Sequence, residues 1–243
     1  MSTADSAGGR PEPSAVPVPT ADGSMPAHLW RPAPGTASGA GVLVFQEIFG
    51  VTDYIRSRCA DLAALGHTVL APEIYWRLDD TDVDESHPDF LQHSMAIVGR
   101  LDWDLAVSDG QAAFAHLRGL PGVDRVGLLG FCFGGGLAWS VAAREDADAL
   151  VSYYGSAIPQ LLHLAPEIQT PSLHHFGLAD TFIDQETVER IRDAVAGPTT
   201  RFETYEGAGH AFDNPHPVFH HAQASEAAWQ VTIDFLAAHL AGG

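Results

Sequence analysis

Short apolar runs typical of β-strands alternate with longer segments of helical period along this chain, and this alternation limits the fold more than any other feature. The strand-like runs fall at 42–45, 68–72, 125–130, 149–154, 172–176 and 201–205, and the helical segments at 53–65, 89–117, 185–194 and 221–240. Strands separated by helices pair in parallel and need crossover helices on both faces of their sheet. The sequence therefore predicts an α/β fold with a doubly wound, mostly parallel sheet.

The composition favours one domain preceded by a short tail. Residues 1–14 are rich in Ser, Ala, Gly and Pro, so we expect a disordered leader there. No later linker divides the chain, and 243 residues with 46% hydrophobic side chains can form one substantial core. Residues 15–243 are therefore expected to form a single domain.

The chain shows no sign of export or of a membrane anchor. The N-terminus lacks the apolar segment of a secretory signal, and no run approaches the roughly 18 apolar residues of a membrane span. Two cysteines cannot form a disulfide framework. These features predict a cytoplasmic protein that does not bind membranes.

The charged residues exclude several classes of function. All 12 basic residues are arginines, against 31 acidic residues, and the net charge is −19. Without lysine the chain cannot form a catalytic Schiff base, anchor pyridoxal phosphate or build a P-loop. So acidic a chain also repels nucleic acids. We expect a small-molecule substrate, no nucleic-acid partner, no cofactor and no metal.

The segment LLGFCFGGGLAWS, at 128–140, joins a predicted strand to a predicted helix. It places Cys132 between Gly130 and Gly134, which is the pattern of a nucleophile elbow with cysteine in place of serine. The strained turn needs glycine two residues before and after the nucleophile, and the helix N-terminus favours a thiolate. We interpret Cys132 as a nucleophile; the alternative is a small core residue. Cys59 has no glycine elbow around it, and we expect it to be a packing residue or a surface thiol.

A base and its orienting acid are expected on loops after later strands, in the order nucleophile, acid, histidine. Asp180 follows the strand at 172–176, and His210 follows the strand at 201–205. Both positions lie at the carboxyl edge of the sheet, where α/β proteins build their sites. The alternatives are a turn-capping role for Asp180, with Asp184 as a competing acid, and a surface position for His210.

The chain resembles the dienelactone hydrolase family of the α/β-hydrolase superfamily. The resemblance rests on QEIFGV (46–51), GHTVLAPEIYWR (66–77), GFCFGGG (130–136), YYG (153–155), HHFGLADTFI (174–183) and YEGAGHAF (205–212). It implies an α/β-hydrolase fold and an esterase or lactonase with a Cys132–His210–Asp180 triad that acts through a thioester acyl-enzyme. It also implies that Glu47 is a switch that contacts the resting thiol and helps to form the thiolate.

Glu47 also stands at the end of the strand at 42–45, where burial can raise the pKa of a carboxyl; a loop anchor is the alternative. The backbone N–H groups of Ile48 and Phe133 occupy the positions of an oxyanion hole. Four aromatic residues near strand ends are expected either to line a substrate pocket or to fill the core: Phe49, Tyr75, Tyr154 and Phe212.

The chain departs from the family at two positions that concern the substrate. Typical members hold the substrate carboxylate with two arginines, whose positions fall here near Leu91 and Gln92 and at Asn214. Without these two arginines, an anionic substrate loses the charge-assisted hydrogen bonds that their guanidinium groups would donate. Arg77 and Arg100 are the candidates for a substitute cation, although such arginines are more often structural.

Two further questions stay open at the level of sequence. His216, His220 and His221 have spacings that can bind a metal, but no ligand set accompanies them, so we expect a surface cluster. The competing hypothesis for the whole chain is a non-hydrolytic ligand-binding or redox-sensing protein with a reactive Cys132. We expect a monomer or a small homo-oligomer.

Overall fold

A computed structural model describes residues 10–241 of the chain. Residues 1–9 of the expected leader lie outside the described residues. Arg10 already contacts the body of the protein, because its guanidinium donates to the backbone and side chain of Ser57 and pairs with Asp61. The first strand begins at Ser14.

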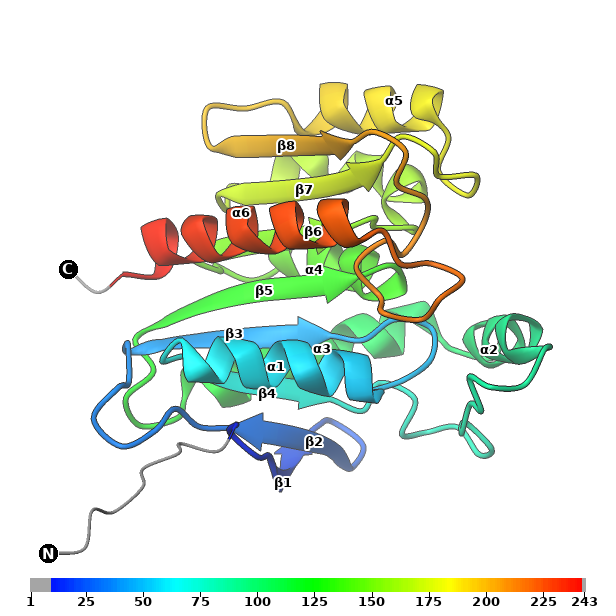
Figure 1. Cartoon of the computed structure of the whole chain (residues 1–243). Coiled ribbons are helices and arrows are strands. Elements are labelled where there is room, and N and C mark those ends of the chain that lie inside the picture. Colours follow the sequence, from blue (N-terminus) through cyan, green and yellow to red (C-terminus); the bar gives the residue numbers. More distant parts are fainter. Residues whose placement is uncertain (1–9, 242–243) are drawn as a thin grey trace, which may run out of the picture.

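An eight-stranded mixed sheet forms the centre of the protein (Figure 1). Its strands are β1 (Ser14–Pro19), β2 (Ser24–Trp30), β3 (Ala40–Phe45), β4 (Thr68–Pro72), β5 (Arg125–Phe131), β6 (Ala149–Tyr153), β7 (Ser172–Gly177) and β8 (Thr200–Tyr205). The order is β1-β2-β4-β3-β5-β6-β7-β8, and all pairs from β4 to β8 are parallel. The predicted α/β class is confirmed, with all six predicted strands in place.

The hairpin of β1 and β2 was not predicted from the sequence. β1 pairs antiparallel with β2, and β2 pairs antiparallel with β4. The two strands contain prolines at 17, 19 and 26. Proline is rare inside a sheet, so the sequence of this segment does not indicate strands. The opposite edge strand, β8, carries an exposed ion pair in which Arg201 Nε lies 2.7 Å from Glu203 Oε1.

Helices cover both faces of the sheet. They are α1 (Asp53–Ala64), α2 (Phe90–Val98), α3 (Trp103–Arg118), α4 (Phe133–Ala142), α5 (Gln185–Val195) and α6 (Ala222–Leu240), with short 3₁₀ turns at η1 (Ile158–Gln160) and η2 (Leu162–Glu167). α1 and α6 cover one face, and α3, α4 and α5 the other (Figure 1). None of the helices within residues 10–241 is long and apolar enough to cross a membrane.

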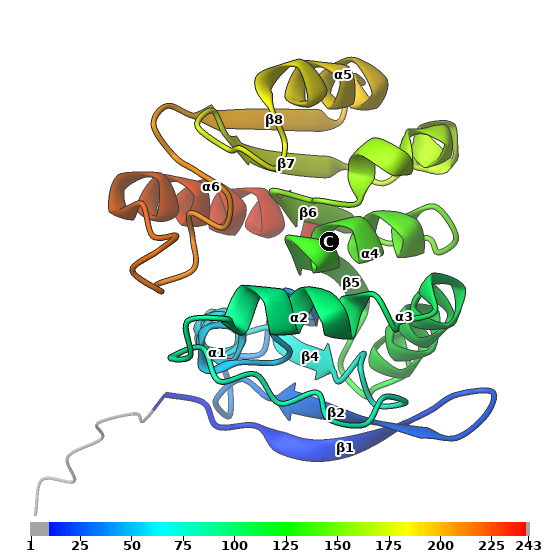
Figure 2. The same ribbon diagram turned by 90° about the vertical axis from the view of Figure 1, so that its right-hand side faces the viewer.

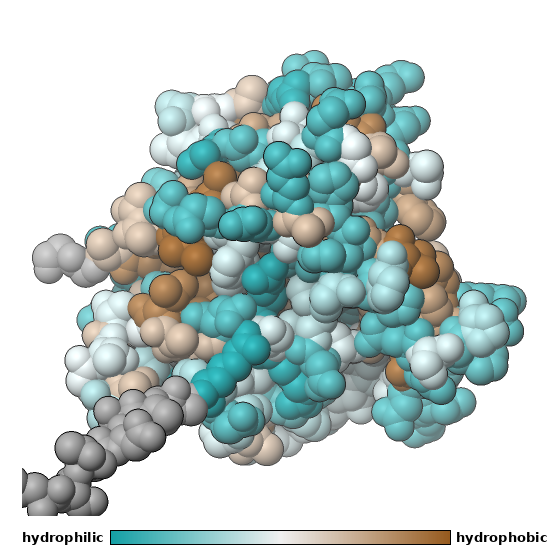
Figure 3. Space-filling view, in the orientation of Figure 1, coloured by the Kyte–Doolittle hydropathy of each residue, from teal (hydrophilic) through white to brown (hydrophobic). Residues whose placement is uncertain are grey.

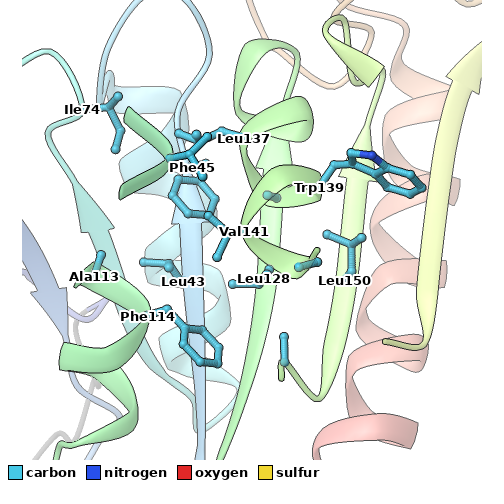
Figure 4. Packing of buried hydrophobic residues seen from close by; sticks show 14 of the residues in the cluster. Leu43, Phe45, Ile74, Ala113, Phe114, Leu128, Leu137, Trp139, Val141 and Leu150 are labelled. Carbon is cyan, nitrogen blue, oxygen red and sulfur yellow. The ribbon is translucent and has the colours of Figure 1, made fainter. Parts of the chain in front are cut away.

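Apolar side chains fill the space between the sheet and its helices. On the α3 and α4 face, one buried cluster contains Leu43, Leu128 and Leu150 of three neighbouring strands together with Val141 of α4 and Phe114 of α3 (Figure 4). The strands are apolar on both sides because both of their faces are covered. The outer face seen in Figure 3 is mostly hydrophilic, with scattered apolar patches.

The single helical segment expected at 89–117 is two helices. α2 ends at Val98, and α3 begins after Asp102, whose carboxylate accepts a hydrogen bond from the Leu105 N–H at 3.1 Å. This N-cap and the preceding Gly99 interrupt the helical path. As a result α2 stands outside the two helical layers, beyond the carboxyl ends of the central strands (Figures 1 and 2).

Candidate active site

Cys132 occupies a strained turn between β5 and α4. Its backbone has φ 53° and ψ −114°, a region that side-chain-bearing residues rarely adopt. A Cβ built on Gly130 would collide with the carbonyl of Gly134, and one on Gly134 with the carbonyls of Phe45 and Gln46. The two glycines are therefore required sterically, and the turn presents the sulfur at the N-terminus of α4.

His210 and Asp180 continue from the sulfur as one hydrogen-bonded chain. His210, in the loop after β8, places Nε2 3.1 Å from Cys132 Sγ and Nδ1 2.7 Å from Asp180 Oδ2. The other Asp180 oxygen accepts the backbone N–H groups of Phe182 and Ile183 at 2.7 and 2.9 Å. The turn after β7 thus fixes the carboxylate, and the carboxylate fixes the imidazole.

The competing acid, Asp184, has a different role. Its side chain caps α5 by accepting the Thr187 N–H at 2.8 Å. That hydrogen bond lowers the pKa of Asp184 and does not involve His210. Among the two candidates for the acid, the geometry therefore selects Asp180.

The surroundings of His210 favour the charged form of its imidazole. Burial alone would lower its pKa, but the Cys132 sulfur and the hydrogen bond to Asp180 outweigh burial and raise the pKa of His210 to about 10. A raised pKa of this kind suits a histidine that is paired with a cysteine nucleophile.

The backbone N–H groups of Phe133 and Ile48 are the candidates for an oxyanion hole. Phe133 is the first residue of α4, so its N–H has no acceptor within the helix. Ile48 lies in the turn after β3, and the described residues provide no hydrogen-bond acceptor for its N–H. Tyr75 donates its hydroxyl to the Ile48 carbonyl at 3.1 Å, which fixes this turn. An oxyanion hole needs N–H groups that are free to bind the substrate oxygen.

Glu47 is buried, with 1% of its surface exposed, and it is held by neutral partners. Asn214 Nδ2 donates to one carboxyl oxygen at 2.6 Å, and the Tyr154 hydroxyl donates to the other at 3.3 Å. Burial is the largest influence on this carboxyl and raises its pKa to about 8. The contact expected between Glu47 and the thiol is not formed within residues 10–241, where the partners of the sulfur are His210 at 3.1 Å and Ser156 at 3.7 Å.

A buried ion pair behind Glu47 was missed at the level of sequence. Asp213, with a fully buried side chain, accepts two hydrogen bonds from the Arg58 guanidinium and one from the Tyr54 hydroxyl at 2.5 Å. Tyr54 also lies 3.4 Å from the Tyr154 hydroxyl. Only the position of Asp213, three residues after His210, hinted at this network, because Arg58 looks like any polar residue of a surface helix.

A cavity of about 500 Å³ opens onto the sulfur. Apolar side chains make up most of its wall, and the lining residues are Glu47, Ile48, Phe49, Leu91, Gln92, Met95, Val98, Trp103, Cys132, Phe133, Ser156, Ala157, Phe182, His210, Ala211 and Phe219. Several of these lining residues were not singled out from the sequence. They come from α2 and from the loops after β6, β7 and β8. The size is typical of a small-molecule site.

The four aromatic residues expected at the pocket have different positions. Phe49 lines the cavity, whereas Tyr75 lines a neighbouring groove of about 450 Å³. Tyr154 and Phe212 are fully buried, and neither lines the cavity. For these two residues the lining role is not found and the alternative, a place in the core, holds: Tyr154 directs its hydroxyl to Glu47, and Phe212 packs against the Tyr154 ring.

Neither candidate arginine replaces the missing clamp. Arg77 pairs with Asp22 and Asp109, and Arg100 donates to two backbone carbonyls at 3.0 and 3.1 Å. Neither lines the cavity. Asn214, at the other clamp position, holds Glu47.

The remaining cysteine and the histidine cluster have structural surroundings. Cys59 is fully buried in α1, and burial raises the pKa of its thiol. His216 packs against the rings of Phe90 and Phe219, and His221 caps α6 by accepting the Ala224 N–H at 3.2 Å. Within residues 10–241 no three His, Cys, Asp or Glu side chains are grouped to hold a metal ion.

The sheet order, the elbow after β5 and the cavity at the carboxyl edge define the architecture of an α/β hydrolase. Comparison with known proteins narrows this class. The sequence model of the dienelactone hydrolase family matches residues 25–240. The chain therefore belongs to the dienelactone hydrolase family.

Individual relatives agree with this assignment. Carboxymethylenebutenolidase 1 of Cupriavidus pinatubonensis is 34% identical over 166 residues, which are 68% of this chain and 70% of the relative. The carboxymethylenebutenolidase of Pseudomonas putida is 31% identical over 208 residues, 84% of this chain and 88% of the relative. A crystal structure from Klebsiella pneumoniae, assigned to the dienelactone hydrolases, has 28% identity and a TM-score of 0.82, and the match covers 93% of this chain and 98% of that one. The protein is a hydrolase that acts on ester or lactone bonds.

Proposed function

We propose that the protein hydrolyses esters or lactones by nucleophilic catalysis at Cys132, through a thioester acyl-enzyme. The observation that carries the proposal is the hydrogen-bonded chain from the Cys132 sulfur to the His210 imidazole and the Asp180 carboxylate, with distances of 3.1 and 2.7 Å. It starts at a strained turn, where Cys132 has a φ of 53°.

In the acylation step the Cys132 thiolate attacks the carbonyl carbon of the substrate. A C–S bond forms, and the π electron pair moves to the carbonyl oxygen, which accepts the N–H groups of Phe133 and Ile48. The oxyanion then collapses and the C–O bond to the leaving group breaks. His210 gives its Nε2 proton to the departing alkoxide, and an alcohol and a thioester remain.

In the deacylation step the neutral His210 accepts a proton from water, and the hydroxide attacks the thioester carbonyl. The C–S bond breaks, the thiolate leaves, and the carboxylic acid is released. Asp180 orients the imidazole throughout and stabilises its charged form. Glu47, behind the oxyanion turn, anchors the loop of Asn214 next to His210.

The test is the release of p-nitrophenolate from p-nitrophenyl acetate. We expect a burst of one equivalent per active site and an acetyl group on the peptide that contains Cys132. Cys132→Ala and His210→Ala should each lower kcat by about 1,000-fold or more. Cys59→Ala is the matched control, because it removes the other thiol, which is buried in α1.

Two outcomes contradict the mechanism. One is full activity in either the Cys132→Ala or the His210→Ala variant. The other is a thiol that alkylates stoichiometrically while no acyl-enzyme forms with any activated ester, which would favour the redox-sensing alternative.

A further inference from the structure

The wall that α2 contributes to the cavity has no cationic side chain. Leu91, Gln92, Met95 and Val98 of this helix face the cavity. The rings of Phe49, Phe133 and Phe219 also line the cavity, with Trp103 at the start of α3. Lining of this kind stabilises a bound substrate mainly by removing its apolar surface from water.

The ionisable groups that line the cavity already have hydrogen-bond partners within the protein. They are Glu47, His210 and Cys132. His210 is bound between Cys132 and Asp180, and Glu47 accepts its hydrogen bonds from neutral donors. A substrate carboxylate in this cavity would therefore lose its hydration, find no free cationic partner, and lie near the Glu47 carboxyl.

The rim of the cavity is also apolar. Phe182 and Met95, both of which line the cavity, are 73% and 58% exposed. The Phe182 ring centroid lies 5.2 Å from that of His210, so this side chain stands next to the reacting groups. Large apolar side chains that stay exposed beside a cavity are typical of a surface that binds an apolar ligand.

We propose that the enzyme selects uncharged esters or lactones whose apolar substituent lies against α2 and Phe182, and that Met95 is a specificity-determining residue at the entrance. This inference rests on the proposed function, since it concerns the substrate of that same site. It excludes carboxylate-bearing substrates as the preferred class.

The experiment compares three p-nitrophenyl esters of matched chain length: the pentanoate, the glutarate monoester with its free carboxylate, and the same glutarate capped as a methyl ester. The capped compound separates charge from size. We expect kcat/KM for the pentanoate and the capped glutarate to exceed that of the free glutarate on the order of 100-fold.

Variants of α2 test the role of Met95. Met95→Arg places a cation at the cavity entrance and should raise kcat/KM for the free glutarate by about 10-fold relative to the capped one. Ala96→Arg is the matched control, because Ala96 is exposed on the same helix but does not line the cavity. It adds the same charge and should leave the ratio within about 2-fold of the wild-type value.

The outcomes separate the inference from the function on which it rests. Faster turnover of the free glutarate than of its capped form by the wild-type enzyme would overturn the selectivity and leave the hydrolase mechanism intact. Equal effects of Met95→Arg and Ala96→Arg would overturn the role of Met95. No Cys132-dependent turnover of any of the three esters would contradict the proposed function itself.

Discussion

Replacing Glu47 by glutamine should make the protein more stable than the wild type at alkaline pH. Glu47 is almost completely buried, and its two hydrogen bonds come from an amide and a hydroxyl, so nothing in direct contact neutralises an ionised carboxylate. Glutamine has the same shape, and its carbonyl can accept the Asn214 amide while its own amide donates to the Tyr154 hydroxyl. The variant therefore has no ionisable group at position 47 but keeps the packing around the side chain.

The magnitude follows from the pKa of the carboxyl. Burial raises the pKa of Glu47 from 4.5 to about 8. Because the folded state binds this proton more tightly than the unfolded state, the contribution to stability is complete below pH 4.5 and is lost as the pH rises through 8. At about 1.4 kcal/mol for each pH unit between the two values, the loss amounts to about 4–5 kcal/mol.

The assay is urea unfolding of the wild type and of Glu47→Gln, followed by tryptophan fluorescence from about pH 5 to about pH 9. Taking the difference between the two free energies of unfolding removes the contributions of all other titrating groups, which the two proteins share. It should grow in favour of the variant by about 4 kcal/mol over this range, because a small part of the loss occurs below about pH 5. Glu226→Gln, at an exposed position of α6, is the control for the loss of one carboxyl group. A Glu47→Gln difference that stays constant within about 1 kcal/mol would refute the argument.

Three other variants probe the elbow, the core and the buried ion pair. Gly130→Ala should cost about 3 kcal/mol or more of stability, or prevent folding, because the new methyl group collides with the Gly134 carbonyl; urea midpoints check this. Burial lowers the pKa of His174 from 6.5 to about 4. The stability that the neutral imidazole contributes is therefore complete above pH 6.5 and is lost as the pH falls through 4. His174→Phe should reduce acid unfolding between these pH values, as measured by circular dichroism. Arg58→Met leaves the Asp213 carboxylate without its cation and should cost about 3–5 kcal/mol in chemical unfolding; a loss under about 1 kcal/mol would contradict the importance of this pair.

The inner strands β3, β4, β5 and β6 could be predicted because they are buried on both faces and read as apolar runs. The elbow could be predicted because backbone sterics admit only glycine at 130 and 134. The positions of Asp180 and His210 followed from the rule that parallel strands gather their carboxyl ends at one edge.

The parts that could not be predicted depend on side-chain direction and on contacts between distant segments. Tyr154 has a backbone φ of 38° and directs its hydroxyl to Glu47, and neither property can be read from the residue type. The pairing of Arg58 with Asp213 joins residues 155 positions apart, which a local pattern cannot show. The break between α2 and α3 depends on two local features, Gly99 at the end of α2 and the cap at Asp102.

The two outer strands of the sheet bear on how the protein behaves at high concentration. An exposed strand edge invites pairing with another molecule and is a common origin of aggregation. On β1, Pro17 and Pro19 lack the N–H groups that an incoming strand would need, and on β8 the Arg201–Glu203 pair would have to be desolvated or displaced. With both edges protected in this way, we expect concentrated solutions to remain free of β-sheet aggregates, and substitution of both prolines by valine to promote thioflavin-binding assemblies.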